Sequence, residues 1–454
     1  MERDIAEDKI ILLFDRYTLE SQYLYESVEK AGYDCIAIVI GENDFLPKEV
    51  FSIYDLLLGY FDESVEIVWE PRFFNEIEVP DTWSISAGVD EPHGKISYLH
   101  EEKGRIYYLE SEKKYLVKSV EWLDRKGHVF VCDHYNRFGR ICARTFYGAE
   151  QQPLSKSWFS AEGKEIIVEN YITGDIIFNN ENIVKLFRTR LDLICYCFKD
   201  MGLEKNRFFI NSLAEPYFIL NRLATMSRNL LFWQESVREE IPINMQEILY
   251  GSGRSMDKVV IQKRRPYDKL LELGANEKKV YKLGFIYPFE KENQYRTEAL
   301  ICTDSDKIEH CQEMIEAFPQ MHFHIAAITV MSPKLLELDT YDNVSLYPAV
   351  KAHVLKELFM KCDYYFDINY YAEVNLAVHK AFIHNQLIFA FRETVHNQED
   401  VAEEHIYPIA EFEKMRIDIK KIMGDEKIMK EHLQKQQRAA LAENVNSYKE
   451  ILDM

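Results

Sequence analysis

Apolar runs and helical stripes alternate at the start of the chain. A continuous apolar run over residues 9–15 predicts a buried strand, and apolar residues three and four apart over residues 18–31 predict an amphipathic helix. A second apolar run, at residues 35–40, predicts the next strand. Because strand, helix and strand follow within about 30 residues, they form a βαβ unit of a parallel sheet, which residues 45–60 complete.

The spacing of apolar residues changes to two between residues 66 and 180. Short segments rich in aromatic and β-branched residues follow one another there, and glycines separate them at roughly regular intervals. This pattern predicts an antiparallel β-meander inserted into the first α/β domain. Its aromatic content favours a protein interface on the meander, and a self-contained core is the alternative. The tryptophans of this region are Trp69, Trp83, Trp122 and Trp158.

Helical spacing returns at residue 183, and strands and helices then alternate as far as residue 391. Residues 183–233 are expected to return to the first domain, and the alternation from residue 241 onward predicts a second parallel sheet. Residues 363–391 predict a strand, a loop, a helix from about Glu373, a turn and a buried strand. A long amphipathic helix is expected over residues 426–452.

These patterns together predict an α/β fold. Two Rossmann-like domains face each other across a cleft, and the antiparallel β-meander is inserted in the first of them. The expected parts are residues 1–65 and 181–240 for the first domain, 66–180 for the meander, 241–425 for the second domain, and 426–454 for a C-terminal helix packing back on the first domain.

Composition narrows the classes of partner and the compartment. The chain has 76 acidic against 55 basic residues and a net charge of −21, which argues against nucleic acid and against simple electrostatic binding to anionic lipid. Its 8 cysteines include no C-x-x-C pair, and the acidic start has no apolar core of a signal peptide. We therefore expect a reduced, cytoplasmic protein. No apolar run is long enough to span a membrane, which leaves peripheral membrane contact open.

Four blocks of sequence carry a family resemblance. Residues 304–327 (DSDKIEHCQEMIEAFPQMHFHIAA), 343–350 (NVSLYPAV) and 358–382 resemble the GtfB family of glycosyltransferase-stabilising proteins of the accessory Sec system, and so do residues 12–47. The resemblance covers nearly the whole chain, including the meander. It implies a GT-B-like glycosyltransferase fold, which agrees with two Rossmann-like domains facing across a cleft.

The resemblance also implies a function. Members of this family are non-catalytic partners of a homologous catalytic O-GlcNAc transferase, and the pair adds GlcNAc from UDP-GlcNAc to Ser and Thr of serine-rich repeat adhesins. The stabilising subunit keeps the catalytic subunit soluble and active and binds the adhesin. The complex is a 2+2 heterotetramer that works in the cytoplasm, at the inner face of the membrane, before export. On this basis we expect a pseudo-glycosyltransferase without catalytic residues, metal or cofactor.

The residues at the expected donor site agree with that inference. Active retaining relatives carry two glutamates eight residues apart around a Gly-Phe-Gly-like turn. Here Ala372 and Lys380 stand at the two glutamate positions, and residues 373–375 fill the turn without a glycine. Bulky side chains then stand where pyrophosphate needs bare backbone. A shifted register makes Glu373 the first carboxylate but still leaves the second one missing.

The remaining polar residues at strand ends are candidates for binding the acceptor polypeptide. We expect them to bind an extended Ser/Thr-rich chain in the cleft, by hydrogen bonds and stacking. The candidates are Arg16, Tyr17, Glu373, Asn375 and Lys380. The basic residues 263–265 either face the cleft or form a solvated loop. His322 and His324 alternate on a strand, but no third ligand follows at metal-binding spacing.

Two other functions stay open at this point. The chain could be an active UDP-sugar glycosyltransferase of the GT-B type with an altered donor site, which predicts binding of a UDP-sugar by this chain alone. It could also be a general interaction scaffold, which predicts no preference for serine-rich acceptors.

Overall fold

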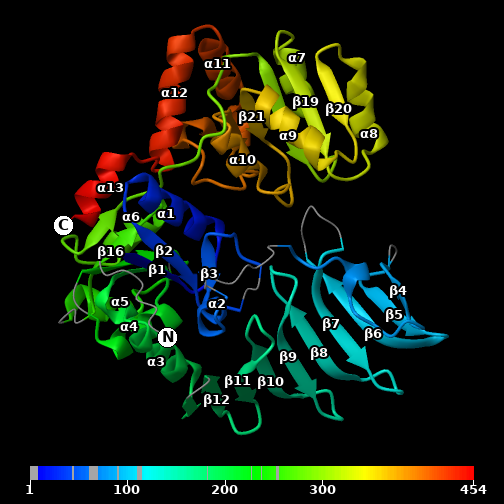
Figure 1. Cartoon of the computed structure of the whole chain (residues 1–454). Coiled ribbons are helices and arrows are strands. Elements are labelled where there is room, and N and C mark those ends of the chain that lie inside the picture. The colour runs from blue at the N-terminus through cyan, green and yellow to red at the C-terminus, as the bar shows by residue number, and fades with distance from the viewer. Residues whose placement is uncertain are drawn as a thin grey trace. The chain divides into compact units, whose positions relative to one another are not determined.

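The computed structural model describes residues 9–42, 45–60, 70–88, 91–109, 115–180, 183–225, 228–236, 238–251 and 255–453 (Figure 1). The predicted strand at residues 65–70, with Trp69, falls almost wholly outside this part of the chain. The chain forms two compact units: residues 1–25, 33–235 and 242–259 make up the first, and residues 26–32, 236–241 and 260–454 make up the second.

The first sheet is parallel where its pairing is described, and its interior strand β1 is entirely apolar and buried. Its seven strands have the order β17-β16-β15-β14-β1-β2-β3. Ile10 of β1 lies opposite Arg207 of β14, so segments before and after the meander pair directly. The strands are β1 Ile10–Phe14, β2 Cys35–Val39, β3 Val50–Ser52, β14 Arg207–Ile210, β15 Asn229–Trp233, β16 Met256–Ile261 and β17 Val280–Lys282. The helices are α1 Leu19–Lys30, α2 Ile53–Leu57, α3 Arg190–Asp200, α4 Glu215–Leu223, α5 Ile243–Tyr250 and α6 Arg264–Glu272.

The second sheet is the inserted meander, coloured cyan to green in Figure 1, and it confirms that prediction. Each of its ten strands pairs with its neighbour in sequence, and the pairs are antiparallel. The strands are β4 Ser84–Ser86, β5 Gly94–Tyr98, β6 Glu101–Tyr108, β7 Val117–Leu123, β8 Val129–Tyr135, β9 Ile141–Tyr147, β10 Pro153–Phe159, β11 Glu165–Asn170, β12 Ile176–Asn180 and β13 Ile183–Phe187. The helix predicted from residue 183 therefore starts only at Arg190, because the alternating residues of β13 pair with β12 instead.

Buried polar and aromatic contacts fasten the meander to the first sheet's α2. Arg137 donates hydrogen bonds to the carbonyl oxygens of Leu46 at 3.1 Å and Val50 at 2.7 Å, and to Asp55 Oδ2 at 3.1 Å. The ring of Tyr54 on α2 stacks on Trp158 of β10 with 3.7 Å between ring centroids. A separate apolar cluster lies toward the β4–β7 end of the meander. Its buried members are Ile77, Ile96, Ile106, Val117, Val120 and Tyr135.

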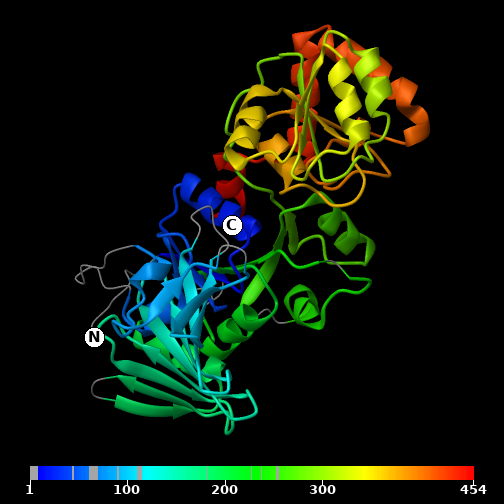
Figure 2. The same cartoon turned by 90° about the vertical axis from the view of Figure 1, so that its right-hand side faces the viewer.

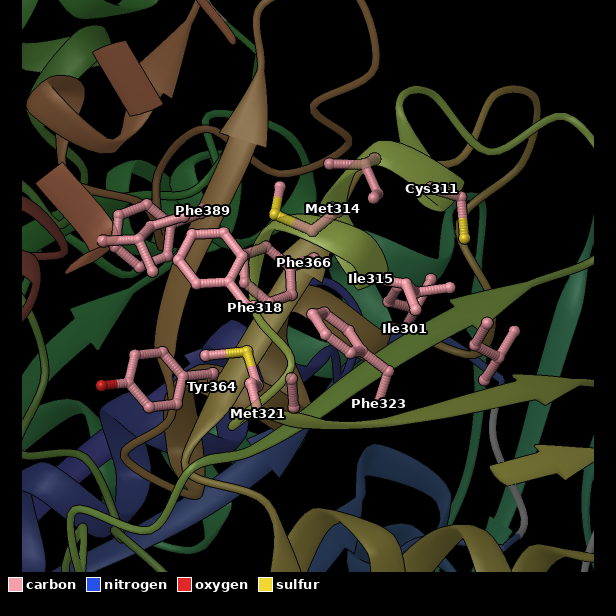
Figure 3. Packing of buried hydrophobic residues seen from close by; sticks show 14 of the residues in the cluster. Ile301, Cys311, Met314, Ile315, Phe318, Met321, Phe323, Tyr364, Phe366 and Phe389 are labelled. Atoms are coloured by element: carbon pink, nitrogen blue, oxygen red, sulfur yellow. The ribbon is translucent and has the colours of Figure 1, made fainter. Parts of the chain in front are cut away.

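The third sheet confirms the second Rossmann-like domain, but its first strand begins at Glu298 rather than soon after residue 241, because β16 and β17 join the first sheet. Its six strands have the order β20-β19-β18-β21-β22-β23, with parallel pairing throughout. Figure 3 shows Phe318, Phe366 and Phe389 in the buried core beside this sheet. The strands are β18 Glu298–Thr303, β19 His322–Ala327, β20 Val344–Tyr347, β21 Tyr364–Asp367, β22 Leu387–Phe391 and β23 Ile406–Tyr407. The helices are α7 Cys311–Ala317, α8 Pro333–Leu336, α9 Ala352–Lys361, α10 Ala377–Ile383, α11 Phe412–Met423, α12 Glu426–Ala439 and α13 Val445–Leu452. Short 3-10 helices lie at Phe74–Glu76 (η1), Leu203–Lys205 (η2), Glu337–Thr340 (η3), Glu403–His405 (η4) and Ile409–Glu411 (η5).

The prediction of one continuous helix over residues 426–452 is wrong. The structure has two helices, α12 and α13, the orange-red and red helices nearest the C-terminus in Figures 1 and 2. The break follows from a left-handed residue, Leu441 at φ 52°, and from the Asn444 side chain, which caps the start of α13. Helix α12 packs on the third sheet, where Gln436 accepts the Ile388 N–H at 2.9 Å and donates to the carbonyl of Gln386 at 2.9 Å.

Candidate acceptor site and the loop before α10

The loop after β1 carries the first two predicted site residues, Arg16 and Tyr17. Arg16 is exposed and Tyr17 is half-buried. The loop backbone is held from both sides: the Asp15 N–H donates to Asn211 Oδ1 at 2.9 Å, and Ser21 Oγ donates to the carbonyl of Arg16 at 3.1 Å. The loop therefore presents Arg16 at the carboxyl edge of the parallel strands, which is the edge where α/β sheets bind ligands.

Sequence reasoning missed the polar residues that follow β14 and β15. Asn211 Nδ2 donates to Ser21 Oγ at 3.0 Å, and Ser21 Oγ lies 3.1 Å from Gln234 Oε1. Glu235 Oε2 accepts the indole N–H of Trp233 at 2.8 Å. The signal was present in the sequence, because Asn211, Gln234 and Glu235 directly follow apolar strands. Only the parallel pairing of β1, β14 and β15 shows that these residues meet at one edge.

The loop between β21 and α10 carries Glu373 and Asn375, and it differs from the prediction. Helix α10 begins at Ala377 rather than near Glu373. The chain turns through two consecutive left-handed residues, Asn375 at φ 48° and Leu376 at φ 56°. An asparagine tolerates this conformation, whereas a leucine adopts it at a cost. This turn brings the Glu373 carboxylate back over the first turn of the helix.

The Glu373 carboxylate occupies the start of α10. Its Oε1 accepts the Val378 N–H at 3.0 Å. Burial raises the pKa of Glu373 above its usual value, against the lowering effect of that N–H. Lys380 and Asn375 are exposed, so both side chains are available to a ligand. The Val378 N–H, which could otherwise donate a hydrogen bond to a phosphate, is thus already bonded to the Glu373 carboxylate.

A buried polar cluster surrounds this loop. Asp367, at the carboxyl end of β21, has a fully buried side chain whose Oδ1 lies 2.6 Å from His396 Nδ1. That hydrogen bond raises the pKa of His396. His379 on α10 makes a similar pair, with its Nδ1 2.6 Å from Asp400 Oδ2. These carboxylates are therefore engaged within the fold. Sequence reasoning missed both pairs, because their partners lie in separate loops.

The basic residues 263–265 also face internal carboxylates. Glu399 lies beside Lys263 and Arg265; burial raises its pKa, and the two positive charges act in the opposite direction. Arg264 lies 3.7 Å from Asp268 on α6. Two acidic side chains, Glu399 and Asp268, therefore lie close to these three cations.

Comparisons with known proteins place the chain in one family. Family models match four segments: the GtfB N-terminal domain at residues 11–57, the GtfB middle domain at 83–188, the GtfB third domain at 190–273, and the GftB/GlyA-F C-terminal domain at 299–436. A curated relative from Streptococcus gordonii, the UDP-N-acetylglucosamine--peptide N-acetylglucosaminyltransferase stabilizing protein GtfB, is 37% identical over 98% of both chains. The chain belongs to the GtfB family.

Solved structures agree with the family and the fold. A chain of the crystal structure of a GtfA/B complex bound to UDP and GlcNAc matches with a TM-score of 0.83 and 37% identity, covering 98% of this chain and 99% of the other. The pneumococcal O-GlcNAc transferase GtfA in complex with UDP and GlcNAc matches with a TM-score of 0.58 at 11% identity, covering 99% of both chains. The GtfB-family chain thus has the GT-B-like fold that the sequence predicted.

The five predicted acceptor-binding residues of this GtfB-family chain are divided between the two units. Arg16 and Tyr17 belong to the first unit, whereas Glu373, Asn375 and Lys380 belong to the second. Glu373 and Asn375 lie in the loop before α10, and Lys380 lies on that helix. The grouping of all five residues in one site stays a prediction.

Among the described residues, no helix is both long and apolar enough to cross a bilayer.

The histidines singled out on β19 engage neighbouring strands. His322 Nε2 lies 2.8 Å from Ser345 Oγ, and His324 Nε2 lies 2.7 Å from Glu298 Oε2. Burial lowers the pKa of His324, against the effect of the Glu298 carboxylate. These contacts give both side chains a role in pairing β18, β19 and β20.

Proposed function

We propose that this chain is the non-catalytic stabilising and acceptor-binding subunit of a protein O-GlcNAc transferase. The complex would add GlcNAc from UDP-GlcNAc to Ser and Thr of serine-rich repeat adhesins before accessory Sec export. Membership in the GtfB family supports the stabilising role. The observation that carries the non-catalytic role is the Glu373 carboxylate bonded to the Val378 N–H at the start of α10.

A nucleotide-sugar diphosphate would meet three obstacles at this loop. It would have to displace the Glu373 carboxylate from the Val378 N–H, and the two anions would repel each other. The turn before the helix has side chains at Asn375 and Leu376, where a donor site has bare glycine backbone. Lys380 also replaces the carboxylate that holds the sugar in active relatives. Positioning of a donor sugar therefore falls to the other subunit.

The proposed partner is a homologous catalytic transferase of the GtfA type, in a 2+2 heterotetramer. A 37% identical chain was solved within a GtfA/B complex, which supports this pairing. We propose the meander as the contact surface. On β12 and β13, Ile177 lies opposite Leu186, and these side chains are 40% and 58% exposed, with Val184 nearby at 72%. A row of exposed apolar residues on one sheet face is typical of a protein interface.

The acceptor would bind to the loops that follow the parallel strands. Arg16 and Tyr17 in the first unit and Glu373, Asn375 and Lys380 in the second supply charge, hydrogen bonds and an aromatic ring. A serine-rich polypeptide has many hydroxyls and few apolar groups, so such polar residues suit it. We place this work in the cytoplasm, at the inner face of the membrane.

Calorimetry on the purified full chain tests the proposal. UDP-GlcNAc and an unglycosylated serine-rich polypeptide are titrated separately, with a reconstituted GtfA-type complex as the positive control for the nucleotide sugar. We expect heat from the polypeptide and none from UDP-GlcNAc. Saturable UDP-GlcNAc binding at about 100 μM or tighter, which is roughly −5.5 kcal/mol, would instead favour an active UDP-sugar transferase.

A further inference from the structure

Two histidines and a glutamate converge between η4 and α12. Glu404 and His405 belong to η4, and His432 belongs to α12. His405 Nε2 lies 2.8 Å from His432 Nδ1, His432 Nδ1 lies 3.1 Å from Glu404 Oε1, and His405 Nε2 lies 3.9 Å from the same oxygen. In the part of the chain that the structure describes, this is the one group of three such side chains whose ligand atoms come this close together.

The triangle of donor atoms has the dimensions of one face of a tetrahedral metal site. Zinc bonds to imidazole nitrogen and carboxylate oxygen at about 2.0–2.1 Å, so donor atoms in a tetrahedral site lie about 3.3–3.4 Å apart. The three observed distances fall on both sides of this value. Small side-chain rotations bring all three into range. Two imidazoles and one carboxylate also form a donor set that suits Zn²⁺.

We propose that Glu404, His405 and His432 bind a zinc ion that clips η4 onto α12. His405 is 1% exposed and its ring lies 4.9 Å from the Phe389 ring, so its position is fixed before metal arrives. The side chains of Glu404 and His432 are 45% and 21% exposed, which gives the ion a path from solvent and a water as fourth ligand.

Lys435 competes with a metal ion for the Glu404 carboxylate. Its Nζ lies 2.8 Å from Glu404 Oε1, the oxygen that would bind zinc. The Lys435 side chain is 45% exposed, so it can move into solvent when metal enters. Without metal, the same atoms form a polar chain from Lys435 through Glu404 and His432 to His405. The lysine is thus a competitor of the metal, and its removal should tighten zinc binding.

Metal binding by the full chain tests the site. Chelator-treated protein is titrated with Zn²⁺ alone by calorimetry, and with Co²⁺ alone for the visible ligand-field absorption of a tetrahedral centre. We expect one ion per chain for the wild type. His432→Asn should weaken binding by about 100-fold or more, the upper end of what losing even an outer-shell partner causes. Lys435→Met should bind zinc more tightly than the wild type.

His322→Asn is the matched control, because it removes a half-buried histidine of β19 outside the triangle. It should bind zinc like the wild type. Circular dichroism checks that each variant folds, and Glu404→Gln, at an exposed position, replaces His432→Asn if that variant unfolds. Zinc binding that His432→Asn and Glu404→Gln leave unchanged, or no tetrahedral Co²⁺ spectrum from the wild type, would overturn the proposal and leave only the hydrogen-bonded chain.

Discussion

At the scale of single residues, a few buried charges hold the second unit's chain in place. Asp363, directly before β21, has a fully buried side chain that contacts Lys291 Nζ at 2.7 Å and Arg296 Nε at 3.0 Å. Its Oδ2 also accepts the Arg296 N–H at 2.8 Å. Burial alone would raise the pKa of Asp363, but the hydrogen bonds from Arg296 and Lys291 lower it below its usual value. The ionised carboxylate is therefore part of the folded state.

Replacing Asp363 tests that assignment. Asp363→Asn should lower the free energy of unfolding by about 3–5 kcal/mol, because Lys291 is left buried without its counter-charge. In the wild type the folded pKa lies below the unfolded value of about 3.9, so this stabilisation is present above that pH and is lost as the pH falls through the folded pKa. Urea unfolding at several pH values measures both effects. The exposed Asp342→Asn should change stability by no more than about 0.5 kcal/mol.

Glu373 offers a second test at this scale. Glu373→Ala should lower the free energy of unfolding by about 0.5–2 kcal/mol, because the Val378 N–H loses the acceptor that caps α10. Glu373→Gln, which keeps an acceptor oxygen, should lose less. Neither variant should gain UDP-GlcNAc binding, since the turn still lacks glycine and Lys380 remains. Thermal unfolding and calorimetry measure the two outcomes, and a nucleotide-sugar signal from Glu373→Ala would mean that this carboxylate alone blocks the site.

At the scale of elements, one buried arginine makes several of the contacts that attach the meander. Arg137 reaches from the β8–β9 turn to the carbonyls before and within β3 and to Asp55 of α2, and the side chains of Arg137 and Asp55 are 7% and 10% exposed. Strand β10 adds the stacked Trp158 and Tyr54 rings. The sequence predicted the insertion, but it gave no sign that a buried ion pair fastens the insertion to the first domain.

Arg137→Met should therefore lower the free energy of unfolding by about 3–5 kcal/mol, since it leaves Asp55 buried without its partner. Loss of the Arg137 hydrogen bonds to Asp55 and to the carbonyl oxygens of Leu46, Pro47 and Val50 should also loosen the meander before the parallel sheets unfold. Hydrogen exchange followed by mass spectrometry resolves the order of unfolding. Arg125→Met, on the exposed β7–β8 turn, is the matched control and should behave like the wild type. Equal protection of meander and parallel sheet in Arg137→Met would contradict the expected loosening.

The exposed apolar row of the meander gives a prediction about the partner. The double change Ile177→Glu and Leu186→Glu places two charges on paired positions of β12 and β13. It should weaken association with a GtfA-type subunit by about 100-fold, because burying each glutamate carboxylate in the core of an interface costs binding free energy. Native mass spectrometry of the mixed subunits measures the loss of the proposed 2+2 assembly. Val330→Glu, at an 84% exposed position of the second unit, should assemble normally. Intact assembly of the double variant would move the interface elsewhere.

At the scale of the whole molecule, each of the two units presents a polar loop at the carboxyl ends of its parallel strands. The first loop shows an exposed Arg16, and the helix α10 that follows the second loop shows an exposed Lys380. Both cations stand out in a chain with a net charge of −21. A polypeptide bound by both loops would depend on each of them, whereas one bound by a single unit would depend on one.

Alanine variants separate these cases. Arg16→Ala and Lys380→Ala should each weaken binding of an unglycosylated serine-rich polypeptide by about tenfold, which corresponds to about 1.4 kcal/mol. Fluorescence anisotropy of the labelled polypeptide measures this, and the double variant should show the summed effect. Lys126→Ala, on the exposed β7–β8 turn, is the control. Unchanged binding by both single variants would exclude the proposed acceptor site.

The sequence by itself determined the order and type of most elements. Within an element, buried positions recur at a fixed spacing along the chain, so the sequence shows them as a pattern of apolar residues. The continuous apolar run of β1 and the two-residue alternation of the meander are such patterns. The absence of glycine from residues 373–375 and of carboxylates from positions 372 and 380 was equally visible, because residue types at a fixed spacing can be read directly from the sequence.

The tertiary structure alone decided where elements end and which polar groups meet. Residues 183–187 became a strand because β12 lies beside them, and α10 starts at Ala377 because the Glu373 side chain supplies the acceptor that another helical turn would otherwise provide. The contact between His405 of η4 and His432 of α12 likewise joins two segments, and no pattern in the sequence links them. Hydrogen bonds and ion pairs between distant segments leave no periodic trace in a sequence, so only the fold reveals them.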